Sequence, residues 1–250
     1  MCLLFVSYSL HLSAEVSFLS ALKENPHLLA RTQARTNLAS AYFQAGMTAF
    51  AFEEIDQALN LMPRNVAALL LKAQLFQQQN KPELAQKYYG LAFDSNPEDP
   101  QLNLQWGVFD CQNQQFDSAF EKLKRAFALT IGLEQVRVSW IWGQCLKRNH
   151  QFEAANLRMT DAISQLPSLI SEALELAELK IHLGKLSEAE KILENLNDSP
   201  SVSAQSVWLA LHLAERQNQA VKKNHWGKML GLHFSNSVQW RTYLESAAND

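Results

Sequence analysis

Glycine, proline and long apolar runs are all scarce in this sequence, and together these absences point to one fold class. The 250 residues include 8 glycines and 7 prolines, so few residues that break helices are present. Alternating runs of β-branched residues are rare, whereas Ala, Leu, Gln, Glu and Lys are abundant, which favours an all-α chain. No apolar stretch reaches the roughly 18–20 residues that a membrane-spanning helix needs.

An excess of charge of one sign is also absent. The chain has 22 basic and 25 acidic residues, for a net charge of −3, and it contains no basic block and no acidic tail. Binding to nucleic acid without regard to its sequence depends on a basic surface. Nucleic acid is therefore not an expected partner.

Motifs of catalysis are missing as well. The sequence contains no phosphate-binding loop, dinucleotide fingerprint, Gly-x-Ser-x-Gly elbow or His-Glu-x-x-His pair. Its three cysteines form no Cys-x-x-Cys pair and lack metal-ligand spacing, so Cys111 and Cys145 are interpreted as small core or groove residues. The sequence thus predicts no enzymatic activity, no cofactor and no metal.

What the sequence does contain is a repeat of about 34 residues. Small residues recur at steps of 34, 34, 36 and 34, and another small residue follows each of them after twelve positions. The pairs are Ala39 and Ala51, Ala73 and Ala85, Gly107 and Ala119, Gly143 and Ala155, and Ala177 and Ala189. Proline closes three of the units, at Pro63, Pro97 and Pro167. This period and these positions are typical of tetratricopeptide (TPR) repeats, in which small residues let two antiparallel helices approach closely.

The repeat predicts a right-handed TPR superhelix, an α-solenoid. Five units are clear, a degenerate sixth covers 207–234, and a last helix caps the open end, as terminal repeats require. We expect an N-terminal apolar segment or leader helix over 1–31 and one solenoid domain over 32–250. The predicted helices cover 32–45, 48–61, 66–79, 82–95, 100–113, 116–129, 135–148, 151–165, 170–183, 186–196, 203–217, 219–231 and 236–247.

The first helices of the units predict a partner-binding groove, because solenoids bind along the surface that these helices line. Side chains three residues before the small residue, and one after it, are expected to point into it. These positions are Leu70, Gln74, Leu104, Val108, Trp140, Gln144, Leu174 and Glu178. We interpret them as an apolar ribbon edged with polar residues, with Trp140 as the central anchor. The alternative is that the apolar members pack between neighbouring helices.

Beyond the general TPR pattern, the chain resembles the PilF/PilW family of type IV pilus biogenesis proteins over about 34–245. The third unit begins Asn103-Leu104-Gln105-Trp106-Gly107, where the family has an Asn-Asn-Tyr-Gly-like run. The longer step between the third and fourth units, with Ile131 in place of the closing proline, is a further similarity.

The resemblance implies a pilotin, a periplasmic lipoprotein at the inner face of the outer membrane that helps the secretin subunit reach that membrane and assemble. It implies a protein partner and no cofactor, and we expect a monomer. Cys2 precedes the apolar run instead of following it, so outer-membrane attachment would need a lipoprotein signal upstream of Met1. The alternative function is a soluble cytoplasmic TPR adaptor that mediates assembly of another complex.

Overall fold

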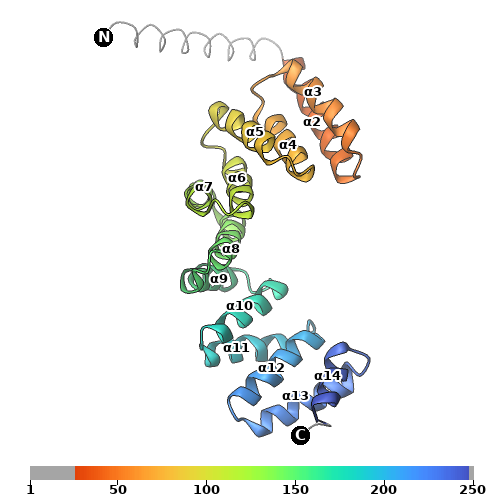
Figure 1. The fold of residues 1–250 in the computed structure, drawn as a ribbon, viewed down its shortest axis with the longest axis vertical. Coiled ribbons are helices and arrows are strands. Elements are labelled where there is room, and N and C mark those ends of the chain that lie inside the picture. The colour runs from red at the N-terminus through yellow and green to blue at the C-terminus, as the bar shows by residue number, and fades with distance from the viewer. Residues whose placement is uncertain (1–25, 248–250) are drawn as a thin grey trace, which may run out of the picture. The chain divides into compact units, whose positions relative to one another are not determined.

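The structure, a computed structural model, describes residues 26–247 and is all-α over that range. These residues form thirteen helices and no strand (Figure 1). The chain separates into an N-terminal and a C-terminal compact unit, each of which contains several repeats, with the division between Phe109 and Asp110. The expected leader segment, 1–31, lies mostly outside the described residues, and its expected boundary falls inside the first helix.

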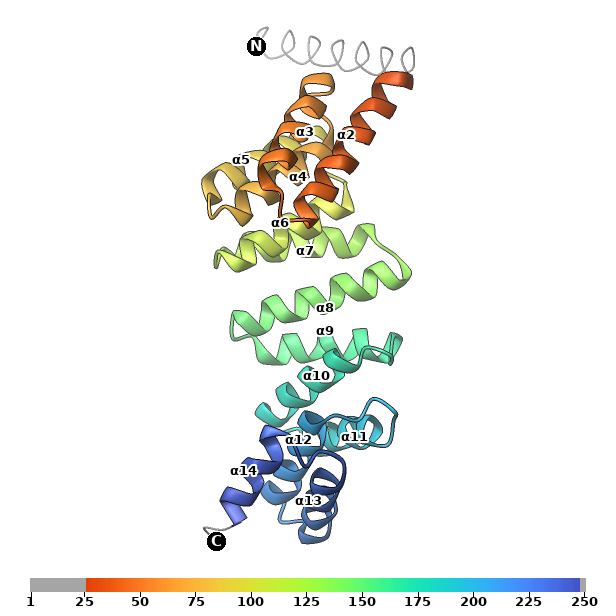
Figure 2. The same cartoon turned by 90° about the vertical axis from the view of Figure 1, so that its right-hand side faces the viewer.

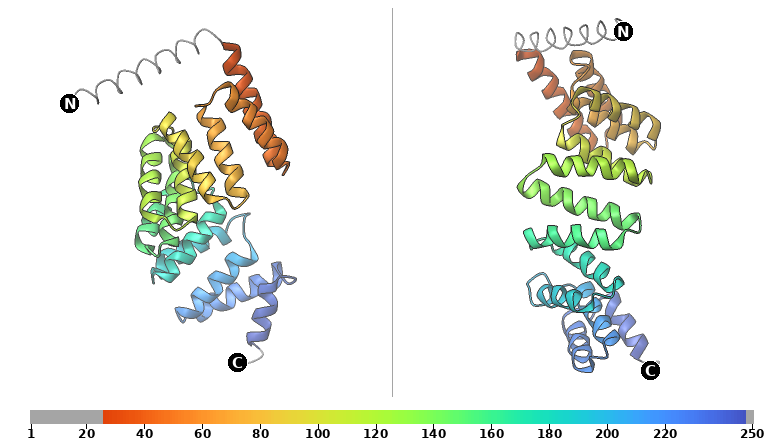
Figure 3. Two further views of the ribbon diagram at one scale, coloured as in Figure 1. Left: turned by 45° about the horizontal axis from the view of Figure 1, so that its top comes forward. Right: turned by 90° about the vertical axis from the view of Figure 1, so that its left-hand side faces the viewer.

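The N-terminal compact unit contains two antiparallel helix pairs and most of a further helix. Its helices are α2 (Pro26–Gln44), α3 (Thr48–Leu61), α4 (Val66–Gln78), α5 (Pro82–Ser95) and α6 (Pro100–Gln112), the last of which continues across the division. Helices α2 and α3 lie side by side as an antiparallel pair, and α4 packs against both of them (Figure 3). This arrangement is the stacking of successive helix pairs that the repeat predicts.

The C-terminal compact unit continues the same alternation of first and second helices. Its helices are α7 (Phe116–Leu129), α8 (Gly132–Arg148), α9 (Phe152–Gln165), α10 (Ile170–His182), α11 (Leu186–Asn197), α12 (Ala204–Arg216), α13 (Ala220–His233) and α14 (Val238–Ala247). Helices α7, α8 and α9 follow one another side by side (Figure 2). Most observed helix ends lie within two residues of the predicted ends. The exceptions are the starts of α2 and α8, which lie six and three residues before the expected ones.

The turn inside each helix pair shows that six units share one backbone pattern. A residue with positive φ occurs once in each turn, and the steps between these residues are 34, 34, 36, 34 and 34. The six are Gly46, Asn80, Gln114, His150, Gly184 and Asn218. In each turn two backbone N–H groups donate to carbonyls of the preceding helix, as Asn218 does to Glu215 and Gln219 to Ala214. Asn218 lies 34 residues after Gly184, so the degenerate sixth repeat has the same turn as the other repeats.

The small residues of the repeat lie where neighbouring helices come closest. The eight alanines among them are 0 % exposed, and Gly107 and Gly143 are buried. A Cβ atom placed on Gly143 would come within 2.6 Å of Cγ of Met159 and 3.4 Å of the Ala155 carbonyl oxygen. Helices α8 and α9 therefore meet at a distance that a side chain at position 143 would prevent.

The last helix, α14, covers the end of the C-terminal compact unit. A Cβ atom on Gly227 of α13 would lie 2.8 Å from the hydroxyl of Tyr243, and one on Gly231 would lie 2.7 Å from the ring of Trp240. Both aromatic residues belong to α14, which contacts α12 and α13. Two aromatic side chains seated on two glycines fix α14 as a cap, as a terminal repeat requires.

A disulfide bond corrects the interpretation of the cysteines. Cys111, near the end of α6, is bonded to Cys145 of α8, with the two Cα atoms 5.9 Å apart. Both side chains are buried, as expected, but they are not simply small core residues. Their separation of 34 residues is one repeat period. Stacking of successive first helices thus brings together two cysteines that are far apart in sequence.

Candidate partner-binding surface

The predicted groove residues divide into a buried group and an accessible group. Leu70, Leu104 and Trp140 are 7 %, 3 % and 7 % exposed. Val108, Leu174 and Gln74 are half-buried, whereas Gln144 and Glu178 are exposed. For the first three residues the expectation of an exposed apolar ribbon is wrong, and the alternative of packing between helices describes them.

Helix geometry explains this division. With 3.6 residues per turn, a residue three before the small residue lies only about 60° from it around the helix. The small residue marks the closest helix contact, so a side chain this near to it is drawn into the packing. The residue one position after the small residue lies about 100° away and reaches the surface.

Trp140 shows what the buried group does instead. Its side chain belongs to a hydrophobic cluster that joins α8, α9 and α10, and this cluster includes Val136, Met159 and Leu176. A tryptophan in this position holds successive helices together. It therefore cannot serve as the exposed central anchor that the sequence suggests.

The accessible surface of the first helices is polar, and its contacts repeat. In the N-terminal compact unit the Gln74 side chain on α4 donates to Oε1 of Gln105 on α6, which is the first helix of the following repeat. In the C-terminal compact unit the Gln144 side chain on α8 donates to Glu175 on α10 at 3.3 Å. Both pairs are 31 residues apart and join the residue after one small residue to the residue two before the next. Neighbouring first helices are thus linked by a recurring side-chain bridge.

The Lys147 side chain extends this polar surface in the C-terminal compact unit, whereas Lys72 in the N-terminal one faces the second helices α3 and α5. Lys147 donates to Glu175 at 2.9 Å, so Glu175 accepts from two residues of α8. Lys72 donates to Asp56 at 2.5 Å and lies 4.6 Å above the ring of Tyr88. Burial acts to lower the pKa of Lys72, but its bonds to Asp56 and Tyr88 outweigh this effect and raise the pKa. Both lysines are therefore positive charges held in place by acids.

Sequence reasoning missed Gln105, Glu175 and Lys147, which form this surface with the residues that it found. Gln105 and Glu175 both lie two positions before a small residue, about 160° around the helix from it. A search for polar residues 31 positions apart on successive first helices would have found both bridges. The arrangement offers amide and charged groups to a partner and contains no group poised for covalent chemistry.

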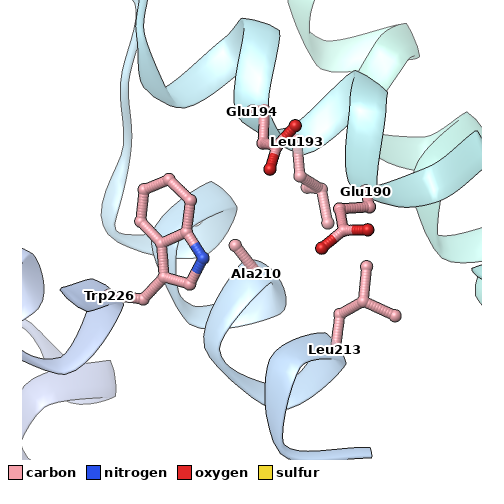
Figure 4. A pocket seen from close by; sticks show the side chains of 6 residues that line it. All are labelled: Glu190, Leu193, Glu194, Ala210, Leu213 and Trp226. Carbon is pink, nitrogen blue, oxygen red and sulfur yellow. The ribbon is translucent and has the colours of Figure 1, made fainter. Parts of the chain in front are cut away.

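A small hollow lies between α11, α12 and α13. It is lined by Glu190, Leu193, Glu194, Ala210, Leu213 and Trp226 (Figure 4). Its volume is about 10 Å³, which is close to the space that one water molecule needs. Its two carboxylates each accept from Lys222 at 2.7 Å, and these bonds raise the pKa of the lysine. The hollow is a structural ion-pair site and is too small for a ligand.

Over residues 26–247, no group of His, Cys, Asp and Glu side chains is arranged to hold a metal ion. None of the helices in that range is both long enough and apolar enough to cross a membrane. The recognisable surface of the described chain is the polar one on the first helices.

No protein-family model matches the chain, and no curated protein matches it. Solved structures do. PilF of Pseudomonas aeruginosa aligns over 88 % of this chain and 99 % of its own, with 21 % identity and a TM-score of 0.71. PilW, described as a widely conserved type IV pilus biogenesis factor, aligns over 85 % and 98 %, with 22 % identity and a TM-score of 0.68.

A third structure is YrrB, described as a TPR protein with an unusual peptide-binding site. It aligns over 76 % of this chain and 97 % of its own, with 12 % identity and a TM-score of 0.61. At these identities the likeness establishes the fold. The chain is a TPR solenoid of the kind found in PilF and PilW.

Proposed function

We propose that this protein is a pilotin-like TPR scaffold of type IV pilus biogenesis, which binds the outer-membrane secretin and promotes its localisation and assembly. The observation that carries the proposal is the extent of the likeness to PilF, which spans 99 % of that chain and 88 % of this one. Two solenoids that share a general repeat can differ in the number of units and in their irregularities. Agreement over the whole length is more specific than a shared repeat.

The irregular junction between the third and fourth units supports the same assignment. Two residues, Thr130 and Ile131, separate α7 from α8, whereas four residues separate α3 from α4 and α5 from α6. Helix α8 has 17 residues, compared with 13 in α4, α6 and α10. The resemblance to the PilF/PilW family identified a longer step between the third and fourth units, with Ile131 in place of the proline that would close the third. The expectation that the connection itself is longer is wrong, because the extra residues lie in helix α8.

The bond between Cys111 and Cys145 supports a periplasmic location. Structural disulfides persist in oxidising compartments such as the bacterial periplasm and are rare in the cytosol, where thiols are kept reduced. The alternative of a cytoplasmic adaptor does not account for this bond. Attachment to the outer membrane remains part of the proposal.

Within this proposal the secretin contacts the polar surface of the first helices. Gln74, Gln144, Glu178 and the partly accessible Val108 and Leu174 are its members from the predicted groove. Leu70, Leu104 and Trp140 are buried and are therefore not expected to contact the secretin. Amide side chains suit an extended segment, because they can both donate to and accept from its backbone.

A deletion strain tests the proposal. Loss of surface pili together with loss of heat-resistant secretin multimers is expected, and the wild-type gene with its upstream DNA should restore both. The protein should fractionate with the periplasm or the outer membrane. Normal secretin multimers in the deletion strain, or recovery of the protein from the cytoplasm alone, would contradict the proposal.

The binding surface is tested by a matched pair of variants. Glu178→Arg reverses a charge on the surface of a first helix, and Glu121→Arg makes the same change at an exposed residue of the second helix α7. Glu178→Arg should weaken secretin binding about tenfold, or ~1.4 kcal/mol, because reversing the charge turns an attractive contact with the partner into a repulsive one. Glu121→Arg should bind as the wild type does. Equal effects of the two changes would place the contact elsewhere on the protein.

A further inference from the structure

The series of side-chain bridges between first helices is broken at Glu178. In the C-terminal compact unit the bridge runs from Gln144, which follows a small residue, to Glu175, 31 positions later. The pair in the N-terminal compact unit has the same spacing. Glu178 is the next residue that follows a small residue, and Leu209 stands 31 positions after it. Leucine has no polar group to offer, so the bridge at this place is open.

Glu178 carries a charge that no described side chain balances. It is exposed on α10, and within residues 26–247 it has no hydrogen bond or ion pair. Glu175, one turn earlier on the same helix, is paired with Lys147 at 2.9 Å. His182, one turn later, packs its ring against that of Phe152, with the centroids 4.6 Å apart. The Glu178 carboxylate is therefore available to a partner.

A partly accessible tryptophan directly precedes Leu209 on α12. Trp208 stands 68 positions, or two repeat periods, after Trp140, but it is half-buried, whereas Trp140 is 7 % exposed. Trp140 shares a cluster with Leu176, which lies 36 positions after it and is 1 % exposed. The residue 36 positions after Trp208 is Leu244 of α14, which is 49 % exposed. The terminal helix thus covers this tryptophan less completely than a full repeat does.

Neighbouring side chains hold the Trp208 ring in place beside α10. The ring of His212 lies 4.1 Å from it at an angle of 86°, and His212 Nδ1 is 3.3 Å from a carboxylate oxygen of Glu215. Trp208 also packs against the same hydrophobic cluster as Leu174, which lies one turn before Glu178 on α10. The neighbouring first helices α10 and α12 thus present a free carboxylate and an aromatic ring.

We infer that Glu178 and Trp208 form a subsite for one cationic side chain, a Lys or Arg, of the partner segment that lies along the first helices. This inference rests on the proposed function, since it names the partner chemistry at the surface assigned there to the secretin. The cation pairs with the Glu178 carboxylate and lies against the indole, the ring that attracts cations most strongly. Its aliphatic stem packs on Leu209.

A neutral or acidic side chain fits this subsite less well. Docking of a partner removes water from Glu178, and a desolvated carboxylate without a counter-charge is costly. An amide could donate one hydrogen bond but would leave the charge unbalanced. A Lys or Arg donates hydrogen bonds and balances the charge as well.

The same combination of groups already holds cations within this chain. Lys72 donates to Asp56 and lies 4.6 Å from the centroid of the Tyr88 ring. Arg158 lies 3.9 Å from the centroid of the Trp142 ring. A cation held by a carboxylate, an aromatic ring or both is thus a contact that this fold already forms.

Selection of random peptides on the immobilised full chain tests the subsite without assuming the partner. Peptides selected on the wild type, and on Glu121→Gln at an exposed residue of α7, should be enriched in Lys or Arg. Glu178→Gln removes the charge and keeps the shape, so peptides selected on it should lose this enrichment. The same enrichment on Glu178→Gln, or none on the wild type, would overturn the inference. Neither result bears on the deletion strain, which tests the proposed function separately.

Charge exchange with the secretin tests the subsite in the proposed complex. Glu178→Arg should weaken binding about tenfold, and changing one particular Lys or Arg of the secretin to glutamate should restore it. If Glu178→Arg binds as the wild type does, or no such change restores binding, the subsite is wrong and the proposed function stands. If the wild-type protein does not bind the secretin, the proposed function fails and the peptide selection decides the inference.

The aromatic half of the subsite is tested with a selected Arg-containing peptide. Trp208→Leu should weaken its binding about two- to fivefold, the usual effect of losing an exposed cation–π contact. Trp208→Phe keeps an aromatic ring and should bind more tightly than Trp208→Leu. Phe50→Leu, at a 50 % exposed residue of the second helix α3, should bind as the wild type does, and the Tm of each variant reports its folding. Wild-type affinity in Trp208→Leu would overturn the role of the ring.

Discussion

At the scale of single residues, glycine marks the closest helix contacts, and Gly143 gives the sharpest case. Its missing side chain leaves room for Met159, which is 0 % exposed and 2.6 Å from where a Cβ would stand. A buried methionine at that distance must shift its neighbours if a methyl group is added. The helix pair α8 and α9 therefore depends on this residue.

Gly143→Ala should lower the free energy of unfolding by about 1–3 kcal/mol, the usual effect of overpacking. Gly90→Ala is the matched control, because Gly90 lies inside α5 and a Cβ there would meet no atom within 4 Å. This control should raise stability by about 0.5–1 kcal/mol, since alanine is the better helix former. Urea unfolding of both variants measures the difference, and equal shifts of one sign would contradict the packing account.

At the scale of helix pairs, one ion pair links the two helices of the fifth repeat. Lys180 of α10 is 2 % exposed, and its Nζ donates to Glu188 of α11 at 2.7 Å. This bond from Lys180 lowers the pKa of Glu188 below its usual 4.5. Because the pKa is lower in the folded state, the pair stabilises the fold above pH 4.5. That stabilisation is lost as the pH falls below 4.5 and through the lowered pKa.

Glu188→Gln should destabilise the protein at neutral pH, because it leaves a buried ammonium group without its carboxylate. Lys180→Met in addition should restore much of the loss, since an apolar chain of similar length fits the same space. Thermal unfolding between pH 3 and pH 7 measures both effects, and the stability of Glu188→Gln should depend less on pH than that of the wild type. Glu121→Gln, at an exposed residue of α7, is the control. If Glu188→Gln behaves as Glu121→Gln does, the pair is unimportant.

At the scale of the whole molecule, the disulfide ties stability to the compartment in which the protein folds. The bond closes a loop of 34 residues. By the chain-entropy relation this contributes about 3–4 kcal/mol to stability. A protein that relies on this bond is more stable in an oxidising compartment than in the cytosol.

The double variant Cys111→Ser/Cys145→Ser should therefore unfold at a lower guanidinium concentration than the oxidised wild type. Reductant should move the wild-type transition towards that of the double variant and leave the variant itself unchanged. Guanidinium titrations with and without dithiothreitol measure this. A wild-type transition that ignores reductant after the thiols have been shown to be free would refute the stabilising role of the bond.

Much of the fold could be predicted because each signal of the repeat depends on residues that are close together in the sequence. A small residue at a helix contact, a turn with positive φ and a closing proline each act within a few residues, so their spacing reveals the units directly. Thus Gly184 and Asn218 continue the period of the turns into the degenerate unit. The starts of α2 and α8 were misplaced because nothing local forbids an extra turn of helix there.

The sequence by itself determined the fold class, the helix pairs and the small residues between them, since these follow from spacing along one helix or one turn. Tertiary structure alone decided which groove residues stay accessible. Trp140 and Gln144 stand on the same helix, but stacking of α8 on α9 and α10 buries the first and leaves the second exposed. It also decided the fate of Cys111 and Cys145, because a bond between residues 34 positions apart forms only when helices of successive units bring the two sulfur atoms together.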